Sequence, residues 1–476
     1  MSSEFDRMSA VELRQRIGEK TISPVDVTRR ALELAEATQH DLNAFFILTP
    51  EAALAAARSA EDAVMKGQPL GPLHGIPFSV KDLIAVAGRP YASGSKAAVG
   101  NVAAADAPAV ERARAAGAIF IGKTTTSEFG CKPVGDSPLT GITRNPWNMA
   151  KTPGGSSAGA VASVAAGITP FALGTDGGGS IRIPCCFTGL AGIKGHFGRV
   201  PVWPTSATPT LAHVGPIART IEDAALLFSA IAGYDTRDPF AVAGPVPDVM
   251  GATRAPVAGL KVAYSPTFGY AKADADVLRV VDAAAKTIEA LGCHVEVVDS
   301  IFEKDPADIW AAEFYAGVGT RLRSFVENQR DLLDPAVAEV LEAALKQDMR
   351  SYYERVFERY AFREKMRLVF EKYDVLISPV LPVSSLDVGK NIPDHLTDRN
   401  LVSWVYYTYP FNLTGQPAGT ICAGTAENGM PVGLQIVGRA LAECDVVRLA
   451  AAYQRTQKPG YNLIPRHRPN NIILQP

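Results

Sequence analysis

The chain opens with a helical pattern of apolar and polar positions. Apolar residues recur at helical spacing over 11–19 and 24–38, and a serine–proline pair before the second segment supplies an N-cap and a first-turn proline. A third helix is predicted at about 50–66, where alanines alternate with charged residues. These three helices are predicted to form a scaffold.

From about residue 73 the pattern changes to strands alternating with helices. Residues 78–80 have the character of a buried strand that leads into Lys81, and a helix over 107–117 precedes a second apolar strand at 118–122. The same order returns at 260–264 (strand), 273–291 (helix) and 294–298 (strand). Such β-α-β units predict an α/β protein.

The remaining chain adds two long helical pieces and several strands to this plan. Helices are predicted over about 306–329, 335–372 and 443–456, and strands near 374–378, 418–423 and 431–438. With no repeat and no clear break, residues 1–476 are interpreted as one domain. Its parts are a helical N-terminal arm at 1–70, a catalytic core at 71–235, and a C-terminal α/β part at 236–476 whose helical insertions shape a substrate pocket.

Composition narrows the class of protein. The 476 residues are 47% hydrophobic and 20% charged, and 47 Lys+Arg against 49 Asp+Glu give a net charge of -2. No overall field attracts nucleic acid or an anionic membrane, and no apolar run reaches the roughly 18 residues of a membrane span. The start of the chain is polar and acidic, which predicts a cytoplasmic protein.

The six cysteines show no CxxC pairing, which favours reduced thiols over disulfides or a zinc site. Cys185 and Cys186, between a proline and a phenylalanine, are interpreted as packing residues rather than as nucleophiles.

A stretch rich in glycine and serine, from Gly154 to Lys194, carries the strongest candidate chemistry. It begins Gly-Gly-Ser-Ser-Ala-Gly and reaches Gly-Thr-Asp-Gly-Gly-Gly-Ser-Ile-Arg at 174–182. Glycines let backbone N–H groups converge where an oxyanion would form, and Ser180 directly follows three of them. From this motif alone, a glycine-rich turn without catalytic function stays open. Phosphate binding is disfavoured because the GxxxxGK[ST] arrangement is missing.

A nucleophilic serine needs a base, and the sequence offers two kinds. None of the seven histidines accompanies a G-x-S-x-G elbow, and His74 and His196 are interpreted as structural. Lys81 is the alternative: a lysine normally titrates near about 10.4, but burial beside a polarised hydroxyl would keep it neutral. Taken alone, Lys81 is better explained as an ordinary solvated surface lysine.

Taken together, Lys81, Ser156 and Ser180 resemble the Ser-cisSer-Lys triad of the amidase signature family. The segments that carry the resemblance are 74–77, Lys81-Asp82, 143–148, 154–159, 174–184, 189–194 and 431–438, so it extends over nearly the whole chain. It implies a large mixed central sheet covered by helices on both faces. It also implies that Ser180 attacks a carbonyl, that Ser156, held by a cis peptide, relays the proton, and that neutral Lys81 accepts it.

The same resemblance assigns roles around the glycine motif. It implies an oxyanion hole formed by the backbone N–H groups of Gly177, Gly178, Gly179 and Ser180. It also implies that Ser157, Asp176 and Arg182 fix this loop, and that neither a metal nor an organic cofactor is needed.

The substrate is predicted to be a small apolar or aryl amide, anilide or carbamate. In the related A subunit of glutamyl-tRNA amidotransferase an aspartate reads the glutamine amine, whereas Val405 occupies the corresponding place here. A buried ammonium would then be unpaired. The expected pocket residues are Gly130, Cys131, Trp310, Phe314, Tyr315 and Trp404, although ordinary core packing also explains the aromatics.

Two other functions stay open at this point. One is the glutamine-hydrolysing subunit of an amidotransferase, and the other is a degenerate binding scaffold, which the intact Lys81, Ser156 and Ser180 set disfavours. A homodimer through the N-terminal helices is compatible with the sequence, which does not decide it.

Overall fold

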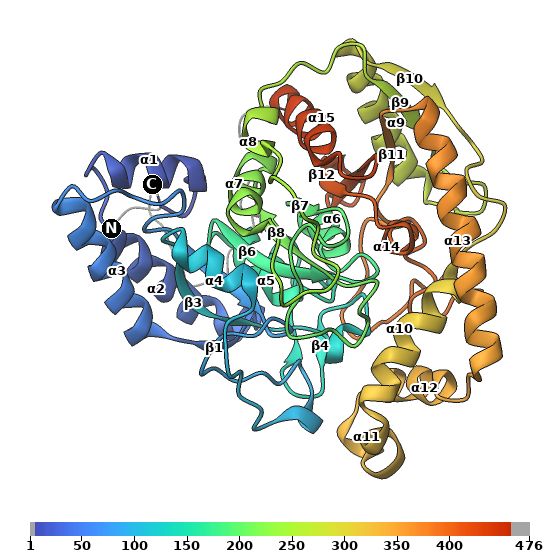
Figure 1. Ribbon diagram of the computed structural model, residues 1–476, viewed down its shortest axis with the longest axis horizontal. Coiled ribbons are helices and arrows are strands. Elements are labelled where there is room, and N and C mark those ends of the chain that lie inside the picture. The colour runs from blue at the N-terminus through green and yellow to red at the C-terminus, as the bar shows by residue number, and fades with distance from the viewer. Residues whose placement is uncertain (1–4, 458–476) are drawn as a thin grey trace.

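A computed structural model describes residues 5–457 (Figure 1). Residues 1–4 of the polar start, on which the prediction of a cytoplasmic protein partly rests, lie outside this range. In the described part of the chain no helix is both long and apolar enough to cross a bilayer.

A mixed sheet of eleven strands runs through the molecule, in the order β1-β3-β2-β6-β8-β7-β12-β13-β11-β9-β10. Its strands are β1 Phe45–Leu48, β2 Pro77–Lys81, β3 Ile119–Thr124, β6 Phe171–Asp176, β7 Ala191–Lys194, β8 His213–Ala218, β9 Lys261–Tyr264, β10 His294–Val297, β11 Val375–Pro379, β12 Ala418–Thr425 and β13 Pro431–Gly438. A separate two-stranded ladder pairs β4 Asp136–Ser137 with β5 Gly141–Ile142.

Helices cover both faces of the sheet. They are α1 Ala10–Gly18, α2 Pro24–Leu42, α3 Pro50–Met65, α4 Pro108–Ala115, α5 Ala158–Ala165, α6 Arg182–Thr188, α7 Ile221–Ile231, α8 Val249–Ala252, α9 Ala275–Ala290, α10 Ala307–Arg321, α11 Arg323–Asn328, α12 Pro335–Ala344, α13 Met349–Lys372, α14 Pro410–Thr414 and α15 Glu443–Thr456. In Figure 1 the blue helices α1–α3 stand at one end of the molecule, and the orange helix α13 at the other. The predicted fold class, a large mixed sheet with helices on both faces, is confirmed.

Several element boundaries differ from the sequence-based expectation. Strands β1, β4, β5, β6, β7 and β8 were not predicted, and the helix expected over 335–372 is two helices. The second of these helices, α13, begins after Asp348. The Asp348 side chain accepts a hydrogen bond from the Ser351 N–H and so caps the helix.

Side chains along a central strand point alternately to the two faces of the sheet, and this alternation positions the candidate site. In β2, Phe78 and Val80 belong to the large core on the face that packs against α7 and α15. Ser79 points the other way, toward α5, where its Oγ lies 3.3 Å from Ser163 Oγ. Because strand side chains alternate between faces, Lys81 lies on the α5 side as well. The helix that begins just after Ser156 therefore packs over the face that carries Lys81.

Candidate active site

Lys81 ends β2 in a fully enclosed position. Its side chain has no solvent-exposed surface, and its Nζ lies 2.6 Å from Ser156 Oγ and 2.7 Å from Thr175 Oγ1. Burial lowers the pKa of Lys81 well below its ordinary value, against a weaker opposing attraction from Asp176. The site therefore favours an uncharged amine held between two hydroxyl groups.

Ser156 is fixed by close backbone packing. The peptide bond that joins Gly155 to Ser156 is cis. A Cβ at Gly155 would lie 2.3 Å from the Val134 carbonyl oxygen, so only glycine fits there. Gly130 approaches from the other side, where an added Cβ would be 3.2 Å from Ser156 Oγ. The serine hydroxyl is thus held in one place beside Lys81.

Ser157 joins the two glycine-rich segments. Its Oγ lies 3.3 Å from both the backbone oxygen and the backbone nitrogen of Thr175 in β6, and its own N–H donates to the Ser180 carbonyl oxygen at 3.3 Å. The segment that carries Ser156 and the loop that carries Ser180 are therefore tied together through Ser157.

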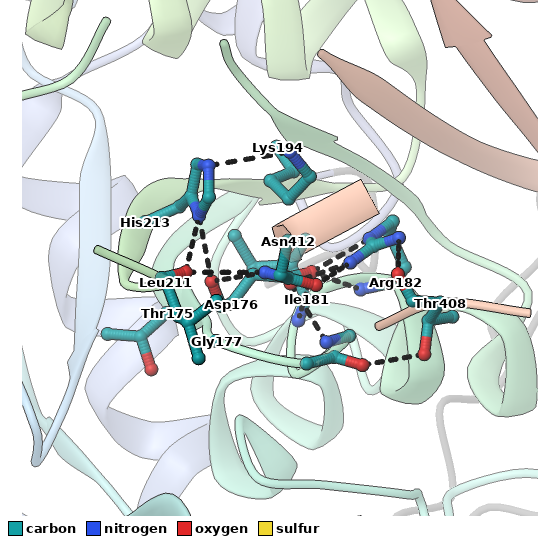
Figure 2. A network of polar contacts seen from close by, with 12 residues as sticks. Thr175, Asp176, Gly177, Ile181, Arg182, Lys194, Leu211, His213, Thr408 and Asn412 are labelled. Carbon is teal, nitrogen blue, oxygen red and sulfur yellow. Dashed lines mark hydrogen bonds and ion pairs between the residues drawn. The ribbon is translucent and has the colours of Figure 1, made fainter. Parts of the chain in front are cut away.

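Residues 176–180, which carry three consecutive glycines and Ser180, are called the glycine loop below. Asp176 of this loop forms a buried ion pair with Arg182 (Figure 2). Arg182 Nη2 lies 2.8 Å from Asp176 Oδ1, and Arg182 Nε donates to Oδ2 at 3.0 Å. Burial alone would raise the pKa of Asp176, but the Arg182 guanidinium outweighs it and holds that pKa below its ordinary value. The charged carboxylate accepts the Gly179 N–H at 2.9 Å, which folds the loop back on itself.

Arg182 is held in turn by three partners. Its guanidinium donates to Asn412 Oδ1 at 2.7 Å, and to the Thr408 carbonyl and Gln435 Oε1 at 2.8 Å each. Gln435 lies on β13 and Asn412 on α14, both more than 200 residues later in the chain. The loop that carries Ser180 is therefore anchored to the distant C-terminal part of the sheet.

A cavity of about 460 Å³ opens beside these groups. Ser156, Thr175, Gly177 and Ser180 line one wall, and Ser180 is partly exposed in it. Further lining residues are mostly apolar or aromatic: Leu83, Ile84, Tyr91, Phe129, Val202, Trp203, Phe314, Val318, Leu322 and Phe325. The two serines predicted from the sequence thus share a cavity, and Lys81 lies behind Ser156.

The predicted pocket residues divide into two groups. Gly130 and Phe314 line the cavity, whereas the buried side chains of Cys131, Trp310, Tyr315 and Trp404 do not reach the lining. Trp310 and Tyr315 pack against one another behind Phe314, with the Trp310 and Phe314 rings stacked at 4.4 Å.

Trp404 makes its contact elsewhere: its Nε1 donates to the Asn391 carbonyl at 2.9 Å.

The sequence did not predict Tyr91 and Trp203 as lining residues, because they lie in loops without a periodic pattern. It also missed Thr175, although this residue is part of the glycine motif itself.

The histidines near the motifs do not act on either serine. His74 Nε2 lies 3.0 Å from the Ala60 carbonyl oxygen. His196 is largely buried, and burial lowers its pKa to about 4. Neither residue is among the cavity lining. His213 does line the cavity, but its Nδ1 faces the carbonyl oxygens of Leu211 and Asp176.

Cysteine and metal chemistry find little support among the described residues. No disulfide joins any of the six cysteines in the described structure, and burial raises the pKa of Cys185 and of Cys186, which disfavours their thiolates. Within residues 5–457 no group of three histidine, cysteine, aspartate or glutamate side chains is arranged to hold a metal ion.

Comparison with known proteins gives consistent results. A family model described as Amidase matches residues 26–447. An acylamidase from Rhodococcus erythropolis is 33% identical over 96% of this chain and 98% of its own length. The A subunit of a glutamyl-tRNA(Gln) amidotransferase from Acidothermus cellulolyticus is 34% identical over 95% of each chain. The crystal structure of a bacterial aryl acylamidase of the amidase signature family superimposes with a TM-score of 0.90 at 29% identity, covering 97% of this chain and 99% of that one.

Proposed function

This chain belongs to the amidase family and is an amide-hydrolysing enzyme, and from that premise we propose that it is a stand-alone serine hydrolase of small apolar or aryl carboxamides. Anilides and carbamates fall within this substrate class. The observation that carries the proposal is the fully buried Lys81 amine, 2.6 Å from Ser156 Oγ at the wall of the cavity that Ser180 shares.

The proposed reaction proceeds through an acyl-enzyme. Ser180 Oγ attacks the amide carbonyl while its proton passes to Ser156 Oγ, whose own proton passes to the neutral Lys81 amine. When the tetrahedral intermediate collapses, the C–N bond breaks and the same relay, run in reverse, protonates the leaving amine. Water then hydrolyses the ester on Ser180 by the same sequence of proton transfers. Ser157, Asp176 and Arg182 hold the two serine segments in register.

The oxyanion would be stabilised by backbone N–H groups of the glycine loop. Gly179 is the least available of the four predicted donors, because its N–H already binds Asp176 Oδ1. The proposal therefore relies on Gly177 and Gly178, with the N–H of Ser180 as a further donor. Such donors typically contribute about 3 kcal/mol each to transition-state stabilisation.

The chemistry of the cavity supports an apolar or aryl substrate. Among the described lining residues, Asp176 is the one carboxylate, and it is paired with Arg182. An α-ammonium group such as that of glutamine would therefore find no free negative partner there, which costs several kcal/mol on burial. Tyr91, Trp203 and Phe314 instead offer flat apolar surfaces.

The glutamine-hydrolysing subunit of an amidotransferase is the second candidate. It is favoured by the 34% identity to the A subunit from Acidothermus cellulolyticus. Val405 counts against this second candidate. It is buried and apolar, and the sequence resemblance places it where the A subunit carries the aspartate that reads the glutamine amine.

Activity of the purified chain alone on three substrates separates these candidates. An aryl anilide, a small aliphatic amide and glutamine are tested at matched concentrations, with release of the amine or of ammonia as the readout. We expect turnover of the anilide and little or none of glutamine. Activity on glutamine alone would contradict the substrate class, and inertness toward all three would contradict the proposed function.

Ser180→Ala tests the mechanism itself. We expect turnover to fall by about 10⁴-fold or more, because the nucleophile is removed, with an unchanged melting temperature. Mass spectrometry after mixing with a slow aryl carbamate should show an added acyl group on the wild type and none on the variant. An acyl group on another residue would overturn the assignment of Ser180.

A further inference from the structure

Three consecutive carbonyl groups of the glycine loop are each held by a side-chain donor. The Gly177 oxygen accepts the indole Nε1–H of Trp310 at 2.8 Å, and the Gly178 oxygen accepts the hydroxyl of Thr408 at 2.6 Å. Neither donor lies near the loop in the sequence.

The Asp176 oxygen, one residue earlier, is held twice. It accepts Asn412 Nδ2 at 3.0 Å and faces His213 Nδ1 at 3.1 Å (Figure 2). Because His213 Nδ1 also lies 2.8 Å from the Leu211 carbonyl, this nitrogen must carry the proton. The other ring nitrogen of His213, Nε2, then accepts a hydrogen bond from Lys194 Nζ at 3.4 Å. Burial lowers the pKa of His213 well below its ordinary value, so the ring stays neutral in this arrangement.

The geometry of the peptide bond links these carbonyls to the candidate oxyanion hole. In a planar trans peptide the C=O and the following N–H point in opposite directions. The cis bonds among the described residues are at Gly155-Ser156 and Trp203-Pro204, so the loop peptides are trans. A donor that fixes the Asp176 carbonyl therefore fixes the direction of the Gly177 N–H, and one that fixes the Gly177 carbonyl fixes that of the Gly178 N–H.

We propose that Trp310 and His213 are positioning residues that aim the oxyanion-hole N–H groups by holding the opposite end of each peptide, and that Thr408 is a positioning residue that holds the turn these peptides form. Trp310 sets the Gly178 N–H, and His213, with Asn412, sets the Gly177 N–H. Thr408 holds the next peptide, whose N–H binds Asp176 Oδ1, and so closes the turn. The inference rests on the proposed function, since it presumes that an oxyanion forms at Ser180.

Aromatic rings also pack closely against the Cα atoms of the loop. A Cβ at Gly177 would lie 2.8 Å from Phe314 Cε2, and one at Gly178 would lie 2.8 Å from Trp310 Cζ2. The Trp310 indole is itself fixed between Phe314 and Tyr315. A hydrogen bond at a carbonyl also polarises its amide and strengthens the N–H as a donor. Trp310 and Tyr315 thus lie behind the loop, whereas Phe314 also lines the substrate cavity.

Trp310→Phe is the first test, because it keeps a buried aromatic ring and removes one N–H. We expect kcat on an aryl anilide to fall roughly tenfold with KM within about twofold. This loss is smaller than the 10²–10³ of losing an oxyanion donor, since the donor stays and only its support is lost. The affinity for an aryl trifluoromethyl ketone, which forms a tetrahedral oxyanion on the serine, should fall by the same factor as kcat/KM.

Trp147→Phe is the matched control. Its indole Nε1–H also donates to a backbone carbonyl, that of Thr188 at 2.9 Å, but outside the glycine loop. We expect kcat and ketone affinity to stay within about twofold of the wild type. A Trp310→Phe enzyme that shows equal losses in substrate and ketone affinity, or no loss in kcat, would overturn the proposal.

Thr408 supplies a second test with a rescue. Thr408→Val keeps the shape and removes the hydroxyl, and should lower kcat roughly fivefold, whereas Thr408→Ser should restore it, as expected for loss of one supporting hydrogen bond. Thr38→Val, which removes a similar buried hydroxyl bond in α2, is the control and should leave kcat unchanged.

Failure to rescue Thr408→Val with serine would overturn the role of the hydroxyl. Ser180→Ala is measured in parallel. If it loses activity while Trp310→Phe and Thr408→Val do not, only this inference fails. If Ser180→Ala keeps its activity, the proposed function fails instead.

Discussion

Two buried lysines on neighbouring strands stand in opposite surroundings. Lys81 ends β2, and Lys123 lies one step away on the parallel strand β3, opposite Val80. Neither side chain has exposed surface. Lys123 Nζ lies 2.8 Å from Asp82 Oδ1 and 3.2 Å from the Pro90 carbonyl oxygen, whereas Lys81 Nζ contacts the hydroxyls of Ser156 and Thr175. The two sites thus differ in whether a carboxylate is the direct partner.

The difference shows what makes a buried lysine suitable as a base. Burial lowers the pKa of both, but at Lys123 the adjacent Asp82 carboxylate opposes the shift directly. At Lys81 the opposing charge, Asp176, acts without an ion-pair contact, and the pKa falls well below its ordinary value. Lys123 is therefore expected to be a charged structural group, and Lys81 a neutral amine able to accept a proton.

The largest expected contrast is in activity. Lys81→Met should lower kcat/KM on an aryl anilide by roughly 10³-fold or more, because the proposed base is lost. Lys123→Met should change it by less than about tenfold in the folded protein, since Lys123 touches none of the three proposed catalytic residues. Rates are normalised to the concentration of folded protein. Near-normal turnover of Lys81→Met at neutral pH would remove Lys81 as the base.

The second contrast is in stability, and here the two variants should differ in sign. Lys123→Met leaves Asp82 buried without its partner and should lower the free energy of unfolding by about 3–5 kcal/mol. Lys81→Met removes an amine that is buried in the folded protein and becomes protonated when the chain unfolds, so this variant should raise the free energy of unfolding. Between the lowered folded pKa and the unfolded value of about 10.4, the unfolded state binds more protons, so the wild type gains stability as pH rises.

Urea titration of both variants at neutral pH measures the two effects. Asp82→Asn combined with Lys123→Met is the control and should recover much of the loss, because no buried charge is left unpaired. Destabilisation of Lys81→Met to the extent of Lys123→Met would contradict the distinction between the two lysines.

The sequence predicted the fold class and most elements, because they depend on local patterns. The closing helix over 443–456 matches α15, and the alternating elements on either side of the glycine stretch were predicted close to their observed bounds. The strands β7 and β8 were missed because both lie inside the sheet, where fully buried strands show no alternation of polar and apolar residues. The strand β12, which pairs with β7, comes from a distant part of the chain.

The candidate site was predictable where its residues share a motif, and not where distant elements meet. Ser156 and Ser180 stand within one glycine-rich stretch, and Lys81 ends a strand with apolar neighbours. His213 and Thr408 carry no local signal, since their role depends on contacts with carbonyls more than thirty residues away. Trp310 was predicted to be a pocket residue from its type alone, but only the folded structure shows which atom its indole contacts.

The pH dependence of wild-type turnover sharpens the comparison further. With a neutral anilide, kcat/KM should rise with pH along one acid limb, because only the uncharged Lys81 accepts a proton. Its midpoint should lie well below the ordinary lysine value of about 10.4. His196, whose pKa lies at about 4, is the competing source of such a limb. His196→Gln should leave the limb in place, and its disappearance in that variant would contradict the assignment to Lys81.

The smallest expected effect concerns the second hydroxyl at Lys81. Thr175→Val removes an oxygen that accepts from Lys81 Nζ at 2.7 Å while keeping the shape of the side chain. This acceptor stabilises the ammonium more than the amine, so its loss should lower the pKa of Lys81 further and move the acid limb of kcat/KM to lower pH by a fraction of a unit. The plateau rate should fall only a few-fold, because Ser156 still contacts the amine.

Thr175→Ser keeps the hydroxyl and should keep the wild-type midpoint, which separates the hydrogen bond from the packing of β6. The pH profiles of both variants, recorded with one neutral anilide, measure the shift. A limb that moves to higher pH in Thr175→Val would mean that the hydroxyl stabilises the neutral amine. In that case direct hydrogen bonds, rather than the absence of a carboxylate, would distinguish Lys81 from Lys123.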